Sequence, residues 1–281
     1  MPAPNITWGG LNLSGIDAFG CTWMTTDFPG WDGSPASTAE TKNKTRAHGA
    51  WAGNAYFNPR HLVGKGIVKA PTEATLKDAF NRLNDAVSLD DSLLTVVEGS
   101  SSRWCMARRT DEVIPTRIPG NLRSAKWSIQ GIADDYRKFS APITASTHLP
   151  SSSGGLLIPY TIPYTISGVQ TSGQVSIFNA GNETGPVTMR LDGPCVGPVI
   201  THVGSGLSLV FAASATLGVG EWWDIDMEAQ SVLANGGPTR AQFITSRQWS
   251  GLEPGNNVWA FTAASYSAGA LLTVTGTPAD K

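Results

Sequence analysis

The chain has 281 residues, of which 41% are hydrophobic and only 15% are charged, and its formal net charge is −2. This composition supplies enough apolar material for one large or two medium-sized domains, so a folded chain is expected rather than a disordered one. The near-neutral balance also excludes an electrostatic grip on nucleic acid, which requires clustered lysine and arginine. The 31 glycines and 18 prolines indicate many turns, which is typical of proteins built from short β-strands.

A single helix is predicted in the first half of the chain, which we interpret as an α+β domain. Thr72 is positioned as the N-cap after Pro71, and Glu73 places a carboxylate in the first turn. Apolar residues recur from Leu76 to Val87 at helical spacing, so the helix at about residues 72–88 is amphipathic and lies on a sheet. The strands of that sheet are expected at residues 61–69, 93–98, 103–109 and 124–133.

Residues 26–58 form a long excursion between these elements. The segment contains the turn sequences Asp27-Phe28-Pro29-Gly30 and Asp32-Gly33-Ser34-Pro35, followed by a polar stretch at 38–45. Such a segment is either a disordered loop or an arm that becomes ordered against a neighbouring molecule.

A domain boundary is expected at about residues 140–156, where proline, serine and glycine accumulate. This boundary divides the chain into an α+β domain at 1–145 and a second domain at 146–281. No segment of helical period follows. Short apolar runs alternate with turns instead, and strands are expected at 175–178, 187–191, 199–203, 207–212, 222–226, 231–234, 242–245, 258–261 and 271–274.

The turns of the second half support a compact all-β domain, with a short polar terminus at 277–281. Asn235-Gly236 is the strongest hairpin signal in the chain, because both positions tolerate positive φ. Eight or nine strands at this spacing predict a β-sandwich or jelly roll. The fold class of the whole chain is therefore mainly β.

A search for catalytic, cofactor-binding and metal-binding residues selects none. The histidines His48, His61, His148 and His202 form no paired ligand spacing, and the nucleophile elbow and phosphate loop are missing from the sequence. Cys21, Cys105 and Cys195 are far apart and form no C-x-x-C pair, so three reduced, mostly buried thiols are expected. The first five residues lack a basic n-region and an apolar stretch, so no signal peptide is expected.

Two features of residues 222–226 have a functional and a structural interpretation. Asp224 and Asp226 lie on one face of a predicted strand, where two carboxylates could bind a divalent cation. The favoured explanation is that both carboxylates lie on a solvated face of the strand. Trp222 and Trp223 point to opposite faces, so one ring is expected in the core and the other exposed or covered. An exposed tryptophan there would suit a sugar or a protein interface equally.

Several local patterns follow one another in a recognisable order. In the first half, Arg46-Ala47-His48-Gly49 precedes the strand at 61–69, which ends in Lys69-Ala70-Pro71 and leads into the helix. The second half contains Val175-x-Ile177-x-Asn179-x-Gly181, Pro186, Leu191-Asp192-Gly193-Pro194, Gly220, Ile225-Asp226, Val232, Asn235-Gly236, Trp249-x-x-Leu252-x-Pro254-Gly255-Asn256-Asn257 and Trp259-x-Phe261. Across nearly the whole chain, this order resembles the distal tail protein family of bacteriophages with long non-contractile tails.

The resemblance implies a structural virion protein at the tail tip, made in the host cytoplasm and without catalysis or cofactor. It implies a hexameric ring formed by a tail-tube-like N-terminal domain, from which a jelly-roll or galectin-like sandwich projects. The implied partners are further copies of the chain, the tail tube protein, the tail-tip hub or tail-associated protein and the tape measure protein. DNA would pass through the lumen only in transit, and no membrane is involved. Some relatives contain an inserted carbohydrate-binding module, for which this chain has no room.

Two other functions remain open at this point. A carbohydrate-binding, lectin-like protein would use the C-terminal sandwich, with Trp222 or Trp223 as the platform, but it leaves the first domain without a role. Another minor tail protein or a tail-tube protein would share the N-terminal fold. Oligomer size, glycan binding and polymerisation into tubes distinguish these functions.

Overall fold

The computed structural model describes residues 4–153 and 169–281. The chain divides into two compact units, Met1–Ser140 with Lys281, and Ala141–Asp280. The boundary expected after residue 145 lies inside a strand of the second unit, because β12, Ile143–His148, pairs along its whole length with β24, Leu271–Gly276. The sequence placed the start of this strand in the linker because the flanking prolines, glycines and serines are typical of a loop. The end of that expected linker, at 154–156, lies outside the described residues.

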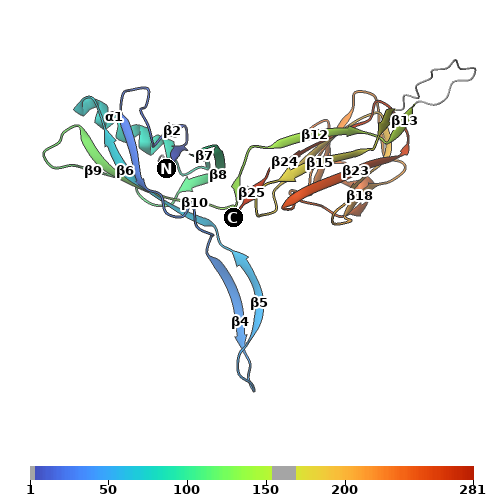
Figure 1. Cartoon of the computed structure of the whole chain (residues 1–281), viewed down its shortest axis with the longest axis horizontal. Helices are drawn as coiled ribbons and strands as arrows, with labels where there is room; N and C mark the ends of the chain where they lie inside the picture. The colour runs from blue at the N-terminus through green and yellow to red at the C-terminus, as the bar shows by residue number, and fades with distance from the viewer. Residues whose placement is uncertain (1–3, 154–168) are drawn as a thin grey trace, which may run out of the picture. The chain divides into compact units, whose positions relative to one another are not determined.

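The first unit is a nearly closed, barrel-like antiparallel sheet, shown in blue to green in Figure 1. Its strand order is β2-β1-β7-β8-β10-β6-β3, with β9 added on β10 and β11 on β8. The strands are β1 Asn5–Trp8, β2 Leu11–Asn12, β3 Thr22–Asp27, β6 Arg60–Lys69, β7 Ser92–Glu98, β8 Ser101–Arg109, β9 Ile114–Arg117, β10 Ser124–Ala133 and β11 Lys138–Phe139. The predicted strands at 61–69, 93–98, 103–109 and 124–133 are confirmed, each to within two residues at either end.

The predicted helix is confirmed as α1, Glu73–Ala86, with Thr72 as its N-cap. The Thr72 hydroxyl accepts a hydrogen bond of 3.1 Å from the amide of Thr75, which satisfies one of the free donors at the helix start. Leu76, Ala79, Leu83 and Ala86 face the core of the sheet. Burial of this apolar stripe, rather than helix propensity, holds a helix of this length in place.

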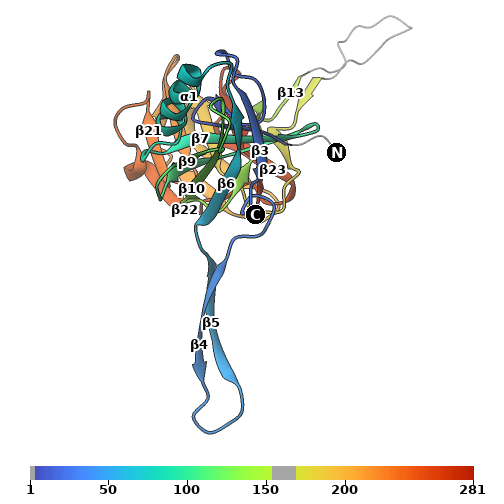
Figure 2. The same ribbon diagram turned by 90° about the vertical axis from the view of Figure 1, so that its left-hand side faces the viewer.

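The segment at 26–58 contains an ordered β-hairpin and is not a disordered loop. Strands β4, Ser37–Asn43, and β5, Ala50–Phe57, pair only with one another, and every residue in them is exposed. Figure 2 shows the hairpin as a long ribbon. Sequence reasoning missed the strands because a ribbon exposed on both faces has no apolar–polar alternation.

The second unit is a β-sandwich of two antiparallel sheets, so the predicted mainly β fold class is confirmed. Apolar side chains alternate inward from both sheets and form one core around Trp223, Trp259 and Phe261. One sheet has the order β12-β24-β16-β20-β21, and the other has the order β15-β23-β17-β18-β22, with β19 on β17. The strands not yet given are β15 Gln174–Asn179, β16 Val187–Asp192, β17 Cys195–His202, β18 Ser208–Phe211, β19 Thr216–Leu217, β20 Trp222–Asp226, β21 Ser231–Ala234, β22 Ile244–Arg247 and β23 Gly255–Ser265, and outside the two sheets β13 Ser151–Ser153, β14 Val169–Thr171 and β25 Ala279–Asp280.

Most of the strands predicted for this unit are confirmed, and one region is corrected. Residues 242–245, expected as a strand, begin as a 3-10 turn, Ala241–Phe243, and only from Ile244 do they pair with β18. The Asn235-Gly236 turn is confirmed with positive φ at both residues, 49° and 68°. The short terminal stretch at 277–281 contains β25. Among the helices of residues 4–153 and 169–281, none is long and apolar enough to cross a membrane.

Candidate functional site

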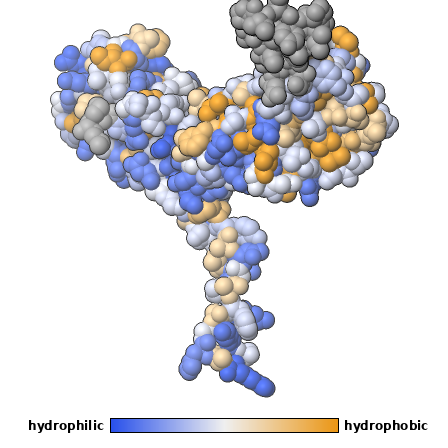
Figure 3. Space-filling model, turned by 45° about the vertical axis from the view of Figure 1, so that its right-hand side comes forward, coloured by the Kyte–Doolittle hydropathy of each residue, from blue (hydrophilic) through white to orange (hydrophobic). Residues whose placement is uncertain are grey.

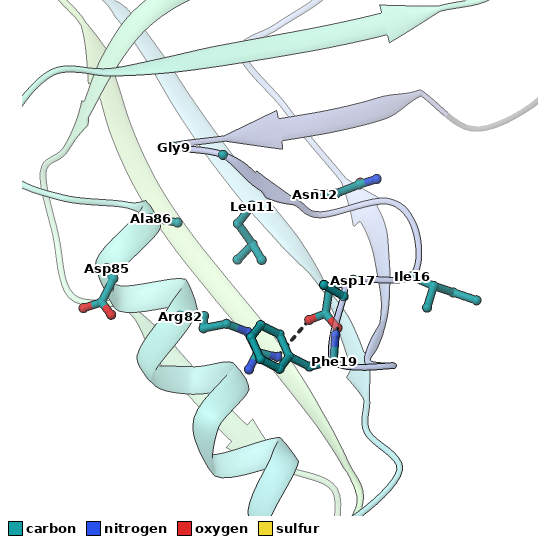
Figure 4. Close-up of a pocket in the computed structure, with 11 residues that line it drawn as sticks. Gly9, Leu11, Asn12, Ile16, Asp17, Phe19, Arg82, Asp85 and Ala86 are labelled. Carbon is teal, nitrogen blue, oxygen red and sulfur yellow. Dashed lines mark hydrogen bonds and ion pairs between the residues drawn. The ribbon is translucent and has the colours of Figure 1, made fainter.

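A groove opens in the first unit between helix α1 and the segment that follows β1. Its volume is about 530 Å³, which lies in the range of sites that bind a sizeable ligand or a protruding side chain. Figure 4 shows Leu11, Ile16 and Phe19 on one side and Asp85 on the helix opposite. The lining residues are Gly9, Gly10, Leu11, Asn12, Ile16, Asp17, Ala18, Phe19, Arg82, Asp85 and Ala86. We call this the Asp17–Arg82 groove.

Asp17 organises the loop that borders the groove. One carboxylate oxygen accepts hydrogen bonds from the amides of Phe19 and Cys21, both at 2.9 Å. The other accepts from the Trp23 indole at 2.9 Å and from Nη2 of Arg82 at 2.8 Å. Only 8% of the Asp17 side chain is exposed. Burial alone would raise the pKa of this carboxyl, but the four hydrogen bonds together lower it, so Asp17 stays ionised and is fully engaged.

Arg82 and Phe19 form a fixed aromatic rim on the groove. The Arg82 guanidinium lies 4.2 Å from the centroid of the Phe19 ring, while its Nη2 is held by Asp17. The guanidinium therefore covers one face of the Phe19 ring, while 61% of this residue is exposed to solvent. Ile16, 72% exposed, extends the apolar rim. The two charged groups at the base of the groove, Asp17 and Arg82, are paired with one another.

Asp85 is the one acidic group of the groove that is not committed to a partner. It lies on the exposed side of α1, and it forms no ion pair with any residue in the described part of the chain. The groove is therefore apolar at its rim and carries a negative charge at its helical side. Asp17, Phe19, Arg82 and Asp85 were not singled out as functional residues from the sequence. Hydrophobic periodicity predicts helices and strands, but it does not show that a carboxylate in a loop, such as Asp17, bonds a residue of a helix far along the chain.

The β4–β5 hairpin is the second surface of the first unit that stands out. Trp51 and Tyr56 are exposed by 66% and 67%, which is unusual for aromatic side chains. Lys42, Lys44 and Arg46 place three positive charges toward its end, whereas Glu40 is the only acidic residue between 37 and 57. The ammonium group of Lys44 lies 4.9 Å from the centroid of the Trp51 ring. Figure 3 shows apolar residues along the hairpin and hydrophilic residues at its end.

The base of the hairpin is anchored by the buried Arg60. Its Nη1 donates to the carbonyl oxygens of Gly30, Trp31 and Gly33, and its Nε donates to that of Tyr136. Burial lowers the pKa of this guanidinium, and the carbonyl dipoles stabilise its positive charge. The loop that precedes β4 is therefore held tightly.

Two further contacts strengthen the same base. Lys138, also buried, donates to the carbonyl oxygen of Trp31 at 3.0 Å. Phe57, the last residue of β5, lies against Tyr136 with 4.9 Å between the ring centroids. The hairpin is thus fixed where it joins the sheet, while the remainder of its two strands pair only with one another.

In the second unit, the two aspartates predicted to share a strand face both accept local hydrogen bonds. Asp224 accepts a hydrogen bond of 3.1 Å from the Trp222 indole, and Asp226 accepts from the amides of Glu228 and Ala229. In the described part of the chain, no group of three or more histidine, cysteine, aspartate or glutamate side chains is placed to hold a metal ion. The structural interpretation of these carboxylates is the one that the geometry supports.

The tryptophan pair divides as predicted, with Trp223 in the core and Trp222 partly exposed. The guanidinium of Arg190 lies 4.5 Å from the centroid of the Trp222 ring. One face of that ring is therefore covered by a charged group, which is unfavourable for stacking a sugar.

The buried histidine and the three cysteines occupy structural positions. His202 is buried and bonds Ser205 and Asn257, and His148 bonds the carbonyl oxygen of Ala270. His48 and His61 are exposed. The three cysteines are reduced and buried, as predicted. Burial raises the pKa of Cys21, raises that of Cys105 to about 12 and raises that of Cys195 to about 11, so none is an activated nucleophile.

Comparison with known proteins identifies the fold. No family model and no curated protein sequence matches the chain. Among solved structures, the chain is similar to the Dit protein of phage SPP1, with a TM-score of 0.67 and 14% sequence identity. The similarity covers 98% of this chain and 99% of the SPP1 protein. That protein is described as a paradigm of the hub adsorption apparatus in phages that infect Gram-positive bacteria. Two structures of the phage p2 baseplate in its activated conformation, with calcium and with strontium, give TM-scores of 0.47 and 0.49 at 11% identity; they cover 98% and 97% of this chain and 98% of each of theirs. The chain has the fold of the SPP1 protein over both of its units.

Proposed function

We propose that this chain belongs to the distal tail protein family and is a structural component of a bacteriophage tail. The observation that carries the proposal is the likeness to the SPP1 Dit protein, which extends over nearly the full length of both chains. A likeness confined to one unit would indicate a shared domain. A likeness that includes a barrel-like unit, a sandwich and their order indicates a shared architecture.

The specific role we propose is the distal tail ring, which joins the tail tube to the baseplate or tail-tip hub. The ring would contain six copies that associate through the first unit. In support, only 15% of the residues are charged, which suits surfaces that become covered by other subunits. Head-to-tail interfaces that close on themselves give a ring of fixed size, whereas the same interfaces without closure give a filament.

The partners we propose are the tail tube protein, the tail-tip hub or tail-associated protein and the tape measure protein. DNA would meet the ring only while it passes through the lumen. A chain with 20 basic and 22 acidic residues suits such passage, because its overall charge provides no net attraction for the phosphate backbone. The protein would reside at the tail tip of the virion.

A structural role without catalysis agrees with the chemistry of the described residues. The titratable groups that have shifted pKa values are engaged in local hydrogen bonds or buried as neutral thiols. The arrangement around Asp17 fixes a loop, and that around Arg60 fixes the base of a hairpin. Neither places a nucleophile beside a base.

The first test is the solution mass of the purified protein, measured by light scattering at several concentrations and accompanied by negative-stain imaging. We expect a mass of six chains and ring-shaped particles. Open tubes that grow with concentration would indicate a tail-tube protein instead. A monomer at every concentration would contradict a self-assembling ring. Detection of the protein at the tail tip by immunogold labelling of virions would test the location separately.

A further inference from the structure

Two surfaces of the first unit have complementary chemistry. The end of the β4–β5 hairpin presents the exposed Trp51 together with a cluster of positive charges. The Asp17–Arg82 groove presents exposed apolar side chains together with the uncommitted carboxylate of Asp85. The aromatic surface of the hairpin end matches the apolar rim of the groove, and its positive charges match the negative charge of Asp85.

We propose that the end of the β4–β5 hairpin of one copy docks in the Asp17–Arg82 groove of a neighbouring copy. This inference rests on the proposed function, because it names the contact by which adjacent copies in the ring would be joined. It assigns a partner to each of two surfaces that otherwise have none in the described part of the chain.

The contact is built around the fixed rim of the groove. Trp51 would pack against Phe19, whose ring is already oriented by Arg82 at 4.2 Å. A rim that is held in place loses little conformational entropy on binding, which favours association. Aromatic residues that fill a partner's recess are the residues that dominate the binding energy of protein interfaces.

The charges give the contact its direction. Lys42, Lys44 and Arg46 would approach Asp85, while Asp17 is already neutralised by Arg82 and does not compete. Opposite charges at the edge of an interface accelerate association and select one orientation.

The hairpin and the groove are different patches of the same chain, so the interface is heterologous. Each copy offers a hairpin to one neighbour and a groove to the other, which is the kind of interface that a closed ring of identical copies uses.

A partner for the hairpin is also required by its own energetics. An isolated two-stranded ribbon is marginally stable in water, and this one has every residue exposed. Each strand of about seven residues at roughly 3.3 Å per residue gives the ribbon a reach of about 23 Å, enough to extend to another subunit. No residue of the hairpin lines the groove of its own copy.

The decisive experiment is cross-linking between copies. One preparation of the full chain would contain Ala50→Cys, beside Trp51 at the hairpin end, and a second Ala18→Cys, beside Phe19 in the groove lining. Each would be treated with a short bismaleimide alone and after mixing and reassembly. The native cysteines are buried and do not interfere. A covalent dimer that forms in the mixture, and in neither preparation alone, is expected. The matched control pairs Ala50→Cys with Leu122→Cys, an apolar residue of the same unit that is 63% exposed and lies outside the groove.

Charge exchange gives an independent test. Asp85→Lys is expected to weaken assembly about tenfold, and the combination with Lys44→Glu is expected to restore it, because each ring interface then regains an opposite pair. Trp51→Ala is expected to weaken assembly about tenfold or more. Tyr266→Ala, which removes an equally exposed aromatic from the second unit, is expected to leave assembly unchanged.

The outcomes separate this inference from the function on which it rests. A ring that forms from the mixed preparations without any cross-link between Ala50→Cys and Ala18→Cys would overturn the hairpin-in-groove contact and leave the ring proposal intact. Tenfold weaker assembly in Asp85→Lys without rescue by Lys44→Glu would likewise count against the contact. A wild-type chain that remains monomeric at every concentration would contradict both proposals.

Discussion

Trp127 and Gly66 lie directly opposite one another on the paired strands β10 and β6, and the indole ring occupies the space that a side chain at Gly66 would fill. A Cβ atom placed on Gly66 would lie less than 3.0 Å from that ring and from the carbonyl oxygen of Met24. The Trp127 ring therefore fits against β6 because Gly66 has no side chain.

We expect Gly66→Ala to destabilise the first unit by about 1–3 kcal/mol, because overpacking forces the Trp127 ring or the backbone of β3 to move. Urea unfolding followed by tryptophan fluorescence measures the effect. Gly33→Ala is the matched control, since nothing lies within 4 Å of a Cβ at that position. Equal stability of the two variants would show that the sheet relaxes freely around Trp127.

Arg60→Met should destabilise the first unit by about 2–4 kcal/mol, because it leaves buried carbonyl oxygens without donors. It should also release the base of the hairpin, so trypsin should cut faster at Lys42, Lys44 and Arg46. Calorimetry and a proteolysis time course measure these two effects. Arg123→Met, a substitution of an exposed arginine, provides the control. Unchanged proteolysis in Arg60→Met would show that the hairpin is not anchored by this residue.

Asp17→Asn should lower stability at neutral pH, because four donors lose an ionised acceptor. The pKa of Asp17 is lowered in the folded protein, so its contribution is present above the unfolded value of 3.8 and is lost as pH falls through the folded value. The wild-type protein should therefore lose more stability than Asp17→Asn when pH is reduced below about 4. Unfolding curves over a pH series measure this difference, with Asp78→Asn on the exposed side of α1 as control. Parallel curves for wild type and Asp17→Asn would refute the assigned role.

The buried thiols should be unreactive in the native protein. Cys105, with a pKa raised to about 12, should resist alkylation at pH 8, when an ordinary thiol with a pKa of 9.0 is partly ionised. The raised pKa also means that the stability contributed by the neutral thiol is complete below pH 9.0 and is lost as pH rises toward 12. Mass spectrometry after iodoacetamide treatment, with and without denaturant, measures the reactivity. Rapid native labelling of Cys105 would contradict its burial.

Trp223→Ala should cost the second unit about 3–5 kcal/mol, because it empties the centre of the sandwich core. Trp222→Ala should cost about 1 kcal/mol or less, since its ring lies on the surface against Arg190. Thermal unfolding of both variants gives the comparison. Glycan binding that the wild type shows and Trp222→Ala lacks would revive the lectin alternative.

Helices and strands with one buried and one exposed face could be predicted from the sequence. Helix α1 was predictable because Leu76, Ala79 and Leu83 follow its buried stripe, and β10 because its residues alternate between core and surface. The hairpin β4–β5 was not predictable from periodicity, because both of its faces are exposed. Strand β12 was hidden by the prolines and serines around it.

The candidate site was beyond sequence reasoning for a different reason. Asp17 and Arg82 meet only because the loop before β3 and helix α1 are brought together by the sheet, and nothing in the local sequence of either residue records that contact. The same holds for Arg60, whose partners come from two loops. The two aspartates at Asp224 and Asp226 show the opposite case, where a local pattern suggests a cation site and the folded protein uses the carboxylates for local hydrogen bonds.

The hairpin leaves the sheet after β3 and returns in β6, and these two strands are direct neighbours in that sheet. Entry and exit therefore lie side by side, and the ribbon between them adds nothing to the core. Evolution can lengthen, shorten or rewrite such an insertion while the remainder of the domain stays the same. If the hairpin joins copies of the chain as proposed, relatives could change how their subunits recognise one another at this single place, and mixed assembly between them would be prevented without any change to the rest of the domain.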